Sequence, residues 1–415
     1  MKKILSVILA VFMLASVAAV FSSCGDQNDD FKLGVILLHD EKSTYDLNFI
    51  EAVNRAADAL GLGEEQVIFK MNIDESNACY DAAVDLVAQG CDVIFADSFG
   101  HEPYIIQAAR EFPDVQFCHA TGTNAHTAGL DNYHNAFASI YEGRYLAGVA
   151  AGLKLQEMME ADSTIVPKIG YVGAFTYAEV ISGYTSFYLG VKSVVEDVTM
   201  AVKFTGSWYD ENEEKLAAID LIENQKCVLI SQHADSMGAP SACEDRSVPN
   251  VSYNGTTIES CPTTFIVSSK IDWTPYIKLI CENTMNGEKI PADWTGTIET
   301  GSVALTDVNV NAAAEGTQAK LDAVKAELLA GTRKVFDTDN FTVTVVTEGE
   351  NKKNVNATVD ANGKLTGYMA DVDSDEAFAA DTQVVSDGCF NESKFRSAPY
   401  FDIQIDGIEL LNAKF

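Results

Sequence analysis

Basic residues are scarce in this sequence. Lysine and arginine number 28 in 415 residues, against 61 aspartates and glutamates, and the formal net charge is −33. A field of that sign repels phosphate backbones, so we do not expect nucleic acid as a partner. It also disfavours an anionic ligand, unless the site itself is locally basic. We interpret the excess of acids as a solubilising outer surface.

Short motifs that mark catalytic or metal sites are missing. Nine cysteines include no C-x-x-C pair, and G-x-S-x-G, G-x-x-x-x-G-K-[ST] and H-E-x-x-H are absent as well. Among the six histidines, His119, His126 and His134 lie close together, but their spacing fits neither one helix face nor a metal-ligand pattern. We therefore expect no catalytic residue, no metal and no cofactor.

A long apolar run occurs at the N-terminus, and nothing after it resembles a second membrane segment. Two lysines precede the uncharged run 4–21, and Ser22 and Ser23 lead into Cys24. This order predicts a secretory signal of the bacterial lipoprotein type over 1–23, with Cys24 lipidated and residues 24–31 as a linker. The alternatives are a retained membrane anchor and plain secretion. All three place the body of the protein outside the cytoplasm, and we expect it on the extracytoplasmic face of the cell membrane.

The other eight cysteines could pair outside the cell, although a chain of this length does not need disulfides. Cys118 and Cys227 lie in apolar, strand-like runs, where a free buried cysteine is the ordinary arrangement. No pairing is predicted.

Strand and helix patterns alternate from residue 32, which is typical of βαβ units and a parallel sheet. The runs 32–38, 66–73, 92–97 and 115–120 are suited to strands, with amphipathic helical patterns between them. The segment 142–155 is a small-residue helix that we expect to pack closely. A second α/β series begins at residue 168 and reaches residue 268.

Two similar series predict two doubly wound lobes. We assign the first lobe to residues 32–155, with a return segment at about 270–300. The second lobe takes residues 156–269 and part of 301–340. The tail 341–415 has alternating strand patterns around Gly349 and Gly363 and is expected to be a β-rich extension. We expect a monomer.

Polar and aromatic residues follow most of the predicted strands. In open parallel sheets, ligands bind beyond the carboxyl ends of the strands. Rings there can stack on a flat ligand, and carboxylates can accept hydrogen bonds from hydroxyl or N–H groups. The alternative is that these Asp and Ser residues only cap helices. The set predicts a site for a neutral, hydroxyl-bearing ligand, with these ligand-binding residues: Tyr45, Asp46, Asp97, Ser98, Phe99, Phe175, Tyr177, Trp208, His233, Asp235 and Asn254.

Several of these segments resemble a known family. The pieces KLGVILLHDEKSTYDLNFIEA, DVIFADSFGHEP, YEGRYLAGVAAGL, KIGYVGAF, VKFTGSWYDENEEKLAAIDLI, LISQHADSMGAPSACED and DWTPYI are similar to the basic membrane protein family of ABC-transporter lipoproteins, which is related to bacterial purine nucleoside receptors. The resemblance covers about residues 32–310. It implies a type I periplasmic-binding-protein fold with a hinge, a small-molecule ligand and an ABC permease as the membrane partner.

The resemblance also implies roles for individual residues. Tyr45 matches the aromatic residue that stacks on the base, and Asp97 matches an acid that holds it. Asp235 falls where family members bind ribose. The aromatic residue of the second lobe matches Phe175, Tyr177 or Tyr184. The chain departs from the family at the run STYDLNF and at Asn254, where an Asp is often found, which leaves the identity of the nucleoside open.

The sequence therefore predicts a receptor that captures a nucleoside, preferably a purine, for import. Three alternatives remain: a binding protein for a sugar or a furanose signal, a sensor that feeds a signalling partner, and an extracellular hydrolase of nucleosides or glycans. The last needs a convergent base and nucleophile or a perturbed carboxylate pair, and the sequence shows no such arrangement.

Overall fold

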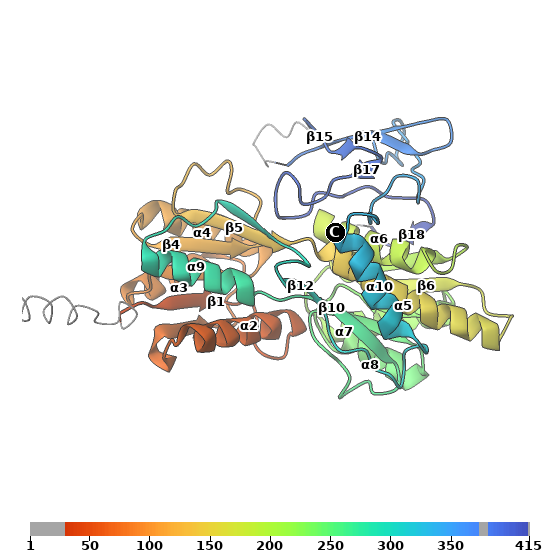
Figure 1. The fold of residues 1–415 in the computed structure, drawn as a ribbon, viewed down its shortest axis with the longest axis horizontal. Helices are drawn as coiled ribbons and strands as arrows, with labels where there is room; N and C mark the ends of the chain where they lie inside the picture. The colour runs from red at the N-terminus through yellow and green to blue at the C-terminus, as the bar shows by residue number, and fades with distance from the viewer. Residues whose placement is uncertain (1–29, 373–380, 414–415) are drawn as a thin grey trace, which may run out of the picture.

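The computed structural model describes residues 30–372 and 381–413. The predicted signal sequence and Cys24 lie outside these residues. Two α/β lobes stand side by side, and a smaller β-rich segment lies across one side of them (Figure 1). The predicted α/β class with two parallel-sheet lobes is confirmed.

The first lobe is built on a six-stranded, entirely parallel sheet in the order β11-β5-β4-β3-β1-β2. The runs LGVI of β1 and VIFA of β3 are buried throughout, as expected for strands covered by helices on both faces. The strands are β1 (Leu33–Ile36), β2 (Val67–Lys70), β3 (Val93–Ala96), β4 (Gln116–Ala120), β5 (Tyr133–Ala138) and β11 (Asp293–Gly296).

Helices flank this sheet, and their ends follow local sequence signals. The first begins where the Ser43 hydroxyl accepts a hydrogen bond from the Asp46 amide, and it ends at Gly61, which adopts a left-handed conformation with φ of 71°. The helices are α2 (Thr44–Leu60), α3 (Asn77–Ala88), α4 (Glu102–Glu111) and α9 (Thr274–Asn286), with short 3-10 turns η1 (Glu64–Gln66) and η2 (Phe99–His101).

The second lobe has a seven-stranded sheet in the order β12-β10-β9-β8-β6-β7-β18, parallel except for β12. Its strands are β6 (Lys168–Gly173), β7 (Thr199–Phe204), β8 (Ile230–Gln232), β9 (Asn250–Tyr253), β10 (Phe265–Ile271), β12 (Val303–Leu305) and β18 (Ile408–Leu410). Its helices are α5 (Ile140–Ala161), α6 (Ala178–Lys192), α7 (Glu211–Glu223), α8 (Gly238–Arg246) and α10 (Thr317–Leu329).

The chain crosses between the lobes three times: from β5 to α5, from β10 to α9, and from β11 to β12. Although the sequence assigns residues 140–155 to the first lobe, α5 packs on α6 and β10 of the second. The crossing therefore lies at Ser139, immediately after β5, rather than at residue 155.

The contact between α5 and α6 depends on glycine. A Cβ added to Gly148 would stand 2.1 Å from the carbonyl oxygen of Phe187, and one added to Gly190 would stand 2.2 Å from that of Tyr145. The two backbones therefore touch, which explains the small residues of the 142–155 segment. This close pair forms the base of the second lobe, from which Arg144 reaches the site described below.

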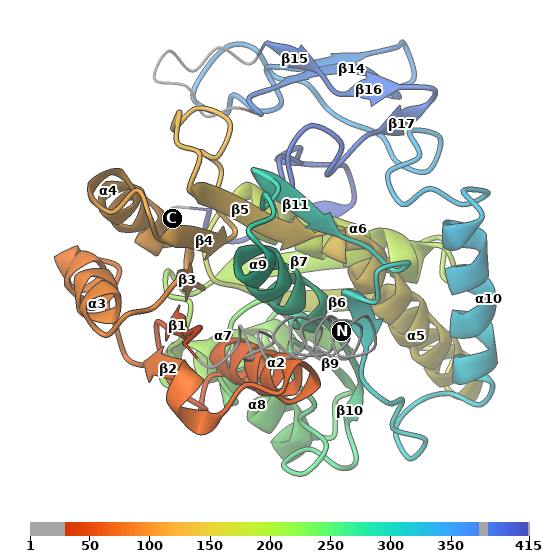
Figure 2. The same cartoon turned by 60° about the vertical axis from the view of Figure 1, so that its left-hand side comes forward.

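The C-terminal segment contains two small antiparallel sheets and then returns to the second lobe. They are built from β13 (Ala357–Val359), β14 (Leu365–Ala370) and β15 (Thr382–Gln383), and from β16 (Val385–Ser386) and β17 (Cys389–Phe390). β18 then pairs in parallel with β7, so the last part of the 341–415 segment completes the second sheet. The segment also lies beside β5 and β11 of the first lobe (Figure 2). There the Ser397 amide donates to Asp293 of β11 at 2.7 Å.

Both sheets reverse their winding order near the centre. The reversal lies between β1 and β3 in the first sheet and between β6 and β8 in the second. Loops diverge at such switch points and leave a crevice at the carboxyl ends of the strands. The two crevices face each other across the lobes.

Candidate functional site

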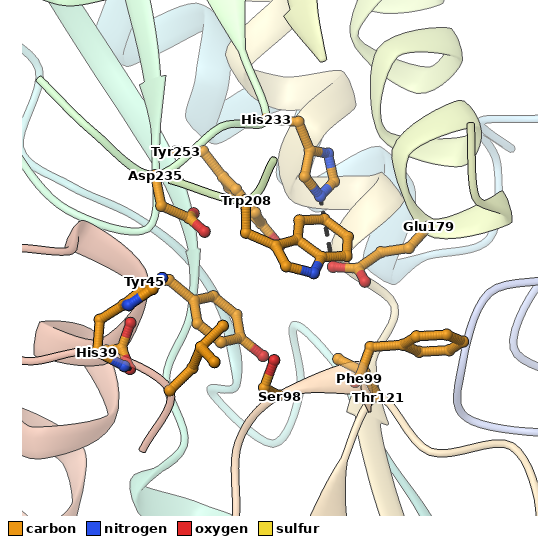
Figure 3. Close-up of a pocket in the computed structure, with 12 residues that line it drawn as sticks. His39, Tyr45, Ser98, Phe99, Thr121, Glu179, Trp208, His233, Asp235 and Tyr253 are labelled. Atoms are coloured by element: carbon orange, nitrogen blue, oxygen red, sulfur yellow. Dashed lines mark hydrogen bonds and ion pairs between the residues drawn. The ribbon is translucent and has the colours of Figure 1, made fainter. Parts of the chain in front are cut away.

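A pocket lies between the lobes, where the chain after β1, β3 and β4 meets the chain after β6, β7 and β8 and the end of β9. The cavity left between the side chains is about 20 Å³, which is room for a water molecule, so the lobes must part to admit a larger ligand. The residues that line it are Leu38, His39, Tyr45, Asp46, Ser98, Phe99, Thr121, Glu179, Trp208, His233, Asp235 and Tyr253 (Figure 3).

Aromatic side chains reach the pocket from both lobes. Tyr45 comes from the first turn of α2 and Trp208 from the loop after β7, so they face the space from opposite sides (Figure 3). The Tyr45 hydroxyl donates to the backbone oxygen of Asp97 at 2.7 Å, and its ring packs edge-on against Phe49 at 4.9 Å. These contacts fix the orientation of the Tyr45 ring before any ligand binds.

A second aromatic group joins the two lobes beside the pocket. Phe99 of the first lobe and Tyr177 of the second have ring centroids 5.3 Å apart. Tyr177 stacks on Phe175 at 5.1 Å, and Phe175 packs edge-on against Trp208 at 4.9 Å. Phe175 therefore lies behind the lining residues and supports both Tyr177 and Trp208.

The lobes also meet through hydrogen bonds beside the pocket. The backbone oxygen of Asp235 accepts from the Thr44 amide and from the Thr44 hydroxyl, each at 3.1 Å. His39 packs against Tyr209 across the same gap with centroids 5.5 Å apart. The structure thus holds the lobes in contact at the pocket, as in a closed form.

Two acids of the first lobe have partners within the protein. Asp46 accepts from the His39 amide at 2.7 Å and from the Ser43 hydroxyl, which ties the β1–α2 loop together. Asp97 is fully buried and accepts from the Leu38 amide at 3.1 Å. Burial and the neighbouring Asp46 carboxylate raise the pKa of Asp97 well above its usual value, which favours its protonated form.

Arg144, His233 and Glu179 form a buried chain in the second lobe. Arg144 donates to His233 Nδ1 at 2.9 Å and to the Gln232 carbonyl at 2.9 Å, and its guanidinium lies 3.4 Å from the centre of the Tyr253 ring. His233 Nε2 lies 3.4 Å from Glu179 Oε1 (Figure 3). Burial and the charge of Arg144 lower the pKa of His233 to about 4, so the imidazole is neutral.

Asp235 brings a carboxylate into the pocket, and no described residue donates a hydrogen bond to it. Burial raises its pKa well above the usual value, with further contributions from the charges of Glu214, Asp46 and Glu179. Glu214 holds the loop beneath, because both of its carboxylate oxygens accept from the Ser236 amide at 3.2 Å. Burial raises the pKa of Glu214 to about 7.

Thr121 lines the pocket in an unusual backbone conformation. Its φ is +67°, which β-branched residues rarely adopt, and its buried hydroxyl has no partner among the described residues. The loop that follows is held by Glu102, which accepts from the amides of Thr123 and Asn124 at 2.8 and 2.9 Å and from the Tyr133 hydroxyl at 2.7 Å. The buried Glu102 carboxylate, with its hydrogen bonds filled, therefore holds Thr121 in this strained backbone conformation.

The structure brings most of the predicted site residues together. Tyr45, Asp46, Ser98, Phe99, Trp208, His233 and Asp235 line the pocket. Tyr177 packs on Phe99 beside the pocket. Asp97 lies behind Tyr45, Phe175 lies behind Trp208, and Asn254 lies beside Tyr253 with a buried side-chain amide nitrogen that has no partner among the described residues.

Several lining residues were not predicted from the sequence. Thr121 directly follows β4, as Asp97 follows β3. The rule that ligands bind beyond the carboxyl ends of strands could therefore have included Thr121. His39 and Tyr253 lie at the ends of strands in the same way. Glu179 carried no such signal, because it lies inside the first turn of α6. Tyr184, an aromatic alternative in the second lobe, is buried and packs on Tyr171 at 5.9 Å.

The described residues give further constraints. All eight cysteines among them are buried and unpaired. No group of three or more His, Cys, Asp or Glu in this part of the chain could hold a metal ion. Over 30–372 and 381–413, no helix has the length and apolar character to cross a membrane.

Comparison with protein families gives a match over residues 35–331 to the family described as ABC transporter substrate-binding protein PnrA-like. A purine-binding protein of Brucella abortus is 30% identical over 296 residues, covering 69% of this chain and 79% of that protein. A putative ABC transporter glucose-binding protein of Haloferax volcanii is 33% identical over 230 residues, covering 55% of each chain.

Solved structures give the same fold. A solute-binding protein of an ABC transporter system from Conexibacter woesei has a TM-score of 0.60 at 20% identity, covering 73% of this chain and 98% of that one. Another from Aeropyrum pernix has a TM-score of 0.61 at 14% identity, covering 77% and 94%. The predicted periplasmic-binding-protein fold is thereby confirmed.

Proposed function

Because the chain belongs to the PnrA-like family of ABC transporter substrate-binding proteins, we propose that it captures a purine nucleoside between its lobes for import by a membrane permease. The family is one of solute-binding proteins rather than an enzyme class. The proposal goes beyond membership of the family in naming a purine nucleoside as the ligand.

The observation that carries the proposal is the composition of the pocket between the lobes. Tyr45 and Trp208 offer aromatic faces from opposite lobes, which suits a flat heterocycle. Asp235 and Glu179 offer carboxylate acceptors for ring N–H groups or sugar hydroxyls. A purine nucleoside carries both features in one molecule.

The named relatives support a purine ligand and leave one alternative to test. The Brucella relative, which covers more of this chain, is named for purine binding. The Haloferax relative is named for glucose, so a sugar-like ligand is the second candidate. Two facing aromatic residues and carboxylates also occur in sugar sites, and the choice between these ligands needs a binding measurement.

The proposal extends to the place and partners of the protein. We propose that Cys24 is lipidated, which would hold the body on the extracytoplasmic face of the cell membrane beside its permease. We also propose that the protein acts as a monomer whose lobes close on the ligand.

The test is ligand-induced stabilisation of the protein, measured by thermal unfolding and by calorimetric titration with nucleosides, nucleobases, sugars and amino acids. A ligand at a hundred times its Kd stabilises the folded state by about 2.7 kcal/mol. Selective stabilisation by adenosine, guanosine or inosine would support the proposal. Stabilisation by sugars alone would replace the purine with a sugar, and no stabilisation by any of them would overturn the proposed ligand class.

A further inference from the structure

We propose that Glu179 is a specificity-determining residue, which His233 and Arg144 hold as a hydrogen-bond acceptor for a donor group of the ligand. The site would then select purine nucleosides that present an N–H group to the second lobe. It would reject analogues in which this group is methylated. The inference rests on the proposed function and names the feature of the ligand, an N–H group, that the site recognises.

Arg144 is the fixed end of this chain of contacts. It comes from α5, whose backbone is held against α6 by the glycine contacts described above, and it is 1% exposed. One terminal nitrogen donates to the Gln232 carbonyl and the other to His233 Nδ1, each at 2.9 Å. Tyr253 covers the guanidinium face at 3.4 Å. A guanidinium so enclosed keeps its charge and has little freedom to move.

The contact with Arg144 decides which nitrogen of His233 carries the proton. An arginine is always a donor, so Nδ1 must accept with its lone pair. The neutral imidazole then has its hydrogen on Nε2, which faces Glu179 Oε1 at 3.4 Å. This distance is long for a hydrogen bond, and such contacts commonly shorten when a ligand closes the site. His233 is therefore a positioning residue with one defined tautomer.

Glu179 and His233 both line the pocket, and Glu179 is the member of the chain that brings a carboxylate to it. Its side chain is 12% exposed, and His233 is its only hydrogen-bond partner among the described residues. The contact with His233 engages Oε1, so Oε2 remains as an acceptor for the ligand. Gly183, one helical turn further along α6, leaves the space that His233 occupies, because a Cβ there would meet His233 Nδ1 at 2.8 Å.

The charge of the pocket favours the same class of ligand. Asp235 adds a second carboxylate on the same lobe, and no lysine or arginine is among the described residues that line the pocket. Arg144 is committed to its protein partners and lies behind the lining. A ligand that brings N–H or O–H donors satisfies these carboxylates, whereas an anionic group would be repelled by them.

The test compares ligand pairs in which methylation removes the N–H donors of one nitrogen. The pairs are guanosine with 1-methylguanosine, inosine with 1-methylinosine, and adenosine with N6,N6-dimethyladenosine, titrated into the wild-type protein and into Glu179→Gln. We expect the wild type to prefer the unmethylated member of at least one pair, and this preference to fall about tenfold in Glu179→Gln. In Glu179→Gln the amide oxygen can still accept from His233 Nε2, so the NH2 group takes the place of the acceptor that faces the ligand. The added methyl groups are equally bulky in both proteins, so the change in the ratio reports this replacement.

A matched control and a rescue separate specificity from folding. Glu213→Gln makes the same change at an exposed position of α7 and should leave the ratio unaltered. His233→Leu should lower the preference as Glu179→Gln does, and His233→Gln should restore part of it, because its amide can still donate to Glu179. A purely structural role of His233 would weaken both members of a pair equally.

The outcomes distinguish this inference from the proposed function. If the wild type binds none of the purine nucleosides, the proposed ligand class fails. If it binds them and the preference survives in Glu179→Gln, the purine proposal stands and the role given to Glu179 is wrong.

Discussion

Tyr45 shows how a ring can be prepared for a ligand by its own neighbours. Its hydroxyl is held by Asp97 and its edge by Phe49, so the ring loses little freedom when a ligand stacks on it. We expect Tyr45→Ala to weaken purine nucleoside binding by about 1–3 kcal/mol, the range found for stacking of a base on an aromatic residue. Calorimetric titration measures this directly.

The control for this substitution is Tyr45→Phe, which keeps the ring and loses the hydrogen bond to Asp97. It should retain most of the affinity. Equal losses in both variants would mean that the hydroxyl, and not the stacking face, is what matters at this position.

The raised pKa of Asp235 predicts how ligand binding responds to pH. Burial and the charges of Glu214, Asp46 and Glu179 raise its pKa, and Arg144 opposes them in part, so the free protein keeps a proton on Asp235 to a higher pH than usual. The ionised carboxylate accepts a hydrogen bond from an N–H or O–H donor of the ligand more strongly than the neutral acid does. Affinity should therefore rise with pH through the raised pKa of Asp235 and be weaker on the acid side.

Titrations across a series of pH values check this prediction, with Asp235→Asn as the comparison. Glu214 also titrates, at about 7, and supports the same loop. A pH dependence that persists unchanged in Asp235→Asn would assign the effect to Glu214 or another group instead.

Asp97 and Glu179 show which part of the site could be predicted from the sequence. The rule that ligands bind at strand ends identified the loops correctly, but successive residues after a strand point to opposite sides. Asp97 turns inward to the Leu38 amide, and Ser98 beside it lines the pocket. Glu179 lies in the first turn of a helix, where its direction depends on how α6 sits over β6. That placement depends on tertiary packing, and no local sequence pattern indicates it.

At the scale of elements, the α5–α6 pair is the contact most sensitive to a small change. The added methyl group of Gly148→Ala would stand 2.1 Å from the Phe187 carbonyl oxygen, so the helices would have to separate. We expect a loss of about 1–3 kcal/mol in the free energy of unfolding, as for other overpacked cores. Denaturant unfolding followed by circular dichroism measures it.

Gly63→Ala is the matched control, because the nearest atom to its added Cβ is Gln66 Oε1 at an ordinary 3.7 Å. It should leave stability nearly unchanged. If Gly148→Ala were also neutral, the close approach of the helices would not be needed for the fold.

Most elements could be predicted from hydrophobic periodicity, because each βαβ unit buries its own apolar run. The strand pattern expected before Gly349 was wrong, because the segment 334–347 forms no strand and carries only the isolated bridges Asp337–Cys389 and Val346–Lys353. The apolar residues of this segment are buried one by one against other parts of the chain instead. Phe336, for example, stacks on Phe401 with ring centroids 4.2 Å apart. Periodicity shows that a segment is half-buried, but it cannot show whether a partner strand lies beside it.

At the scale of the whole molecule, Thr44 links the two lobes. Its hydroxyl and amide both donate to the Asp235 carbonyl, and the hydroxyl bond can be removed without changing the shape of the side chain. We expect Thr44→Val to favour the open form by about 0.5–1.5 kcal/mol, the usual net value of one hydrogen bond. Ligand dissociation, followed by stopped-flow fluorescence of Trp208, should become several-fold faster.

Thr44→Ser keeps the hydroxyl and should dissociate at the wild-type rate. An equal rate for all three proteins would mean that the hydroxyl contact does not contribute to closure.

Each of the two sheets receives an edge strand from far along the chain: β11 beside β5, and β18 beside β7. About 200 residues separate β7 from β18, and ribosomes add about 5–20 residues per second. The edge of β7 is therefore left uncovered for about 10–40 s in each round of synthesis, with its backbone amides and carbonyls free to pair with another chain. A neighbouring chain can pair with this edge only until β18 is in place, because β18 covers it in the finished molecule.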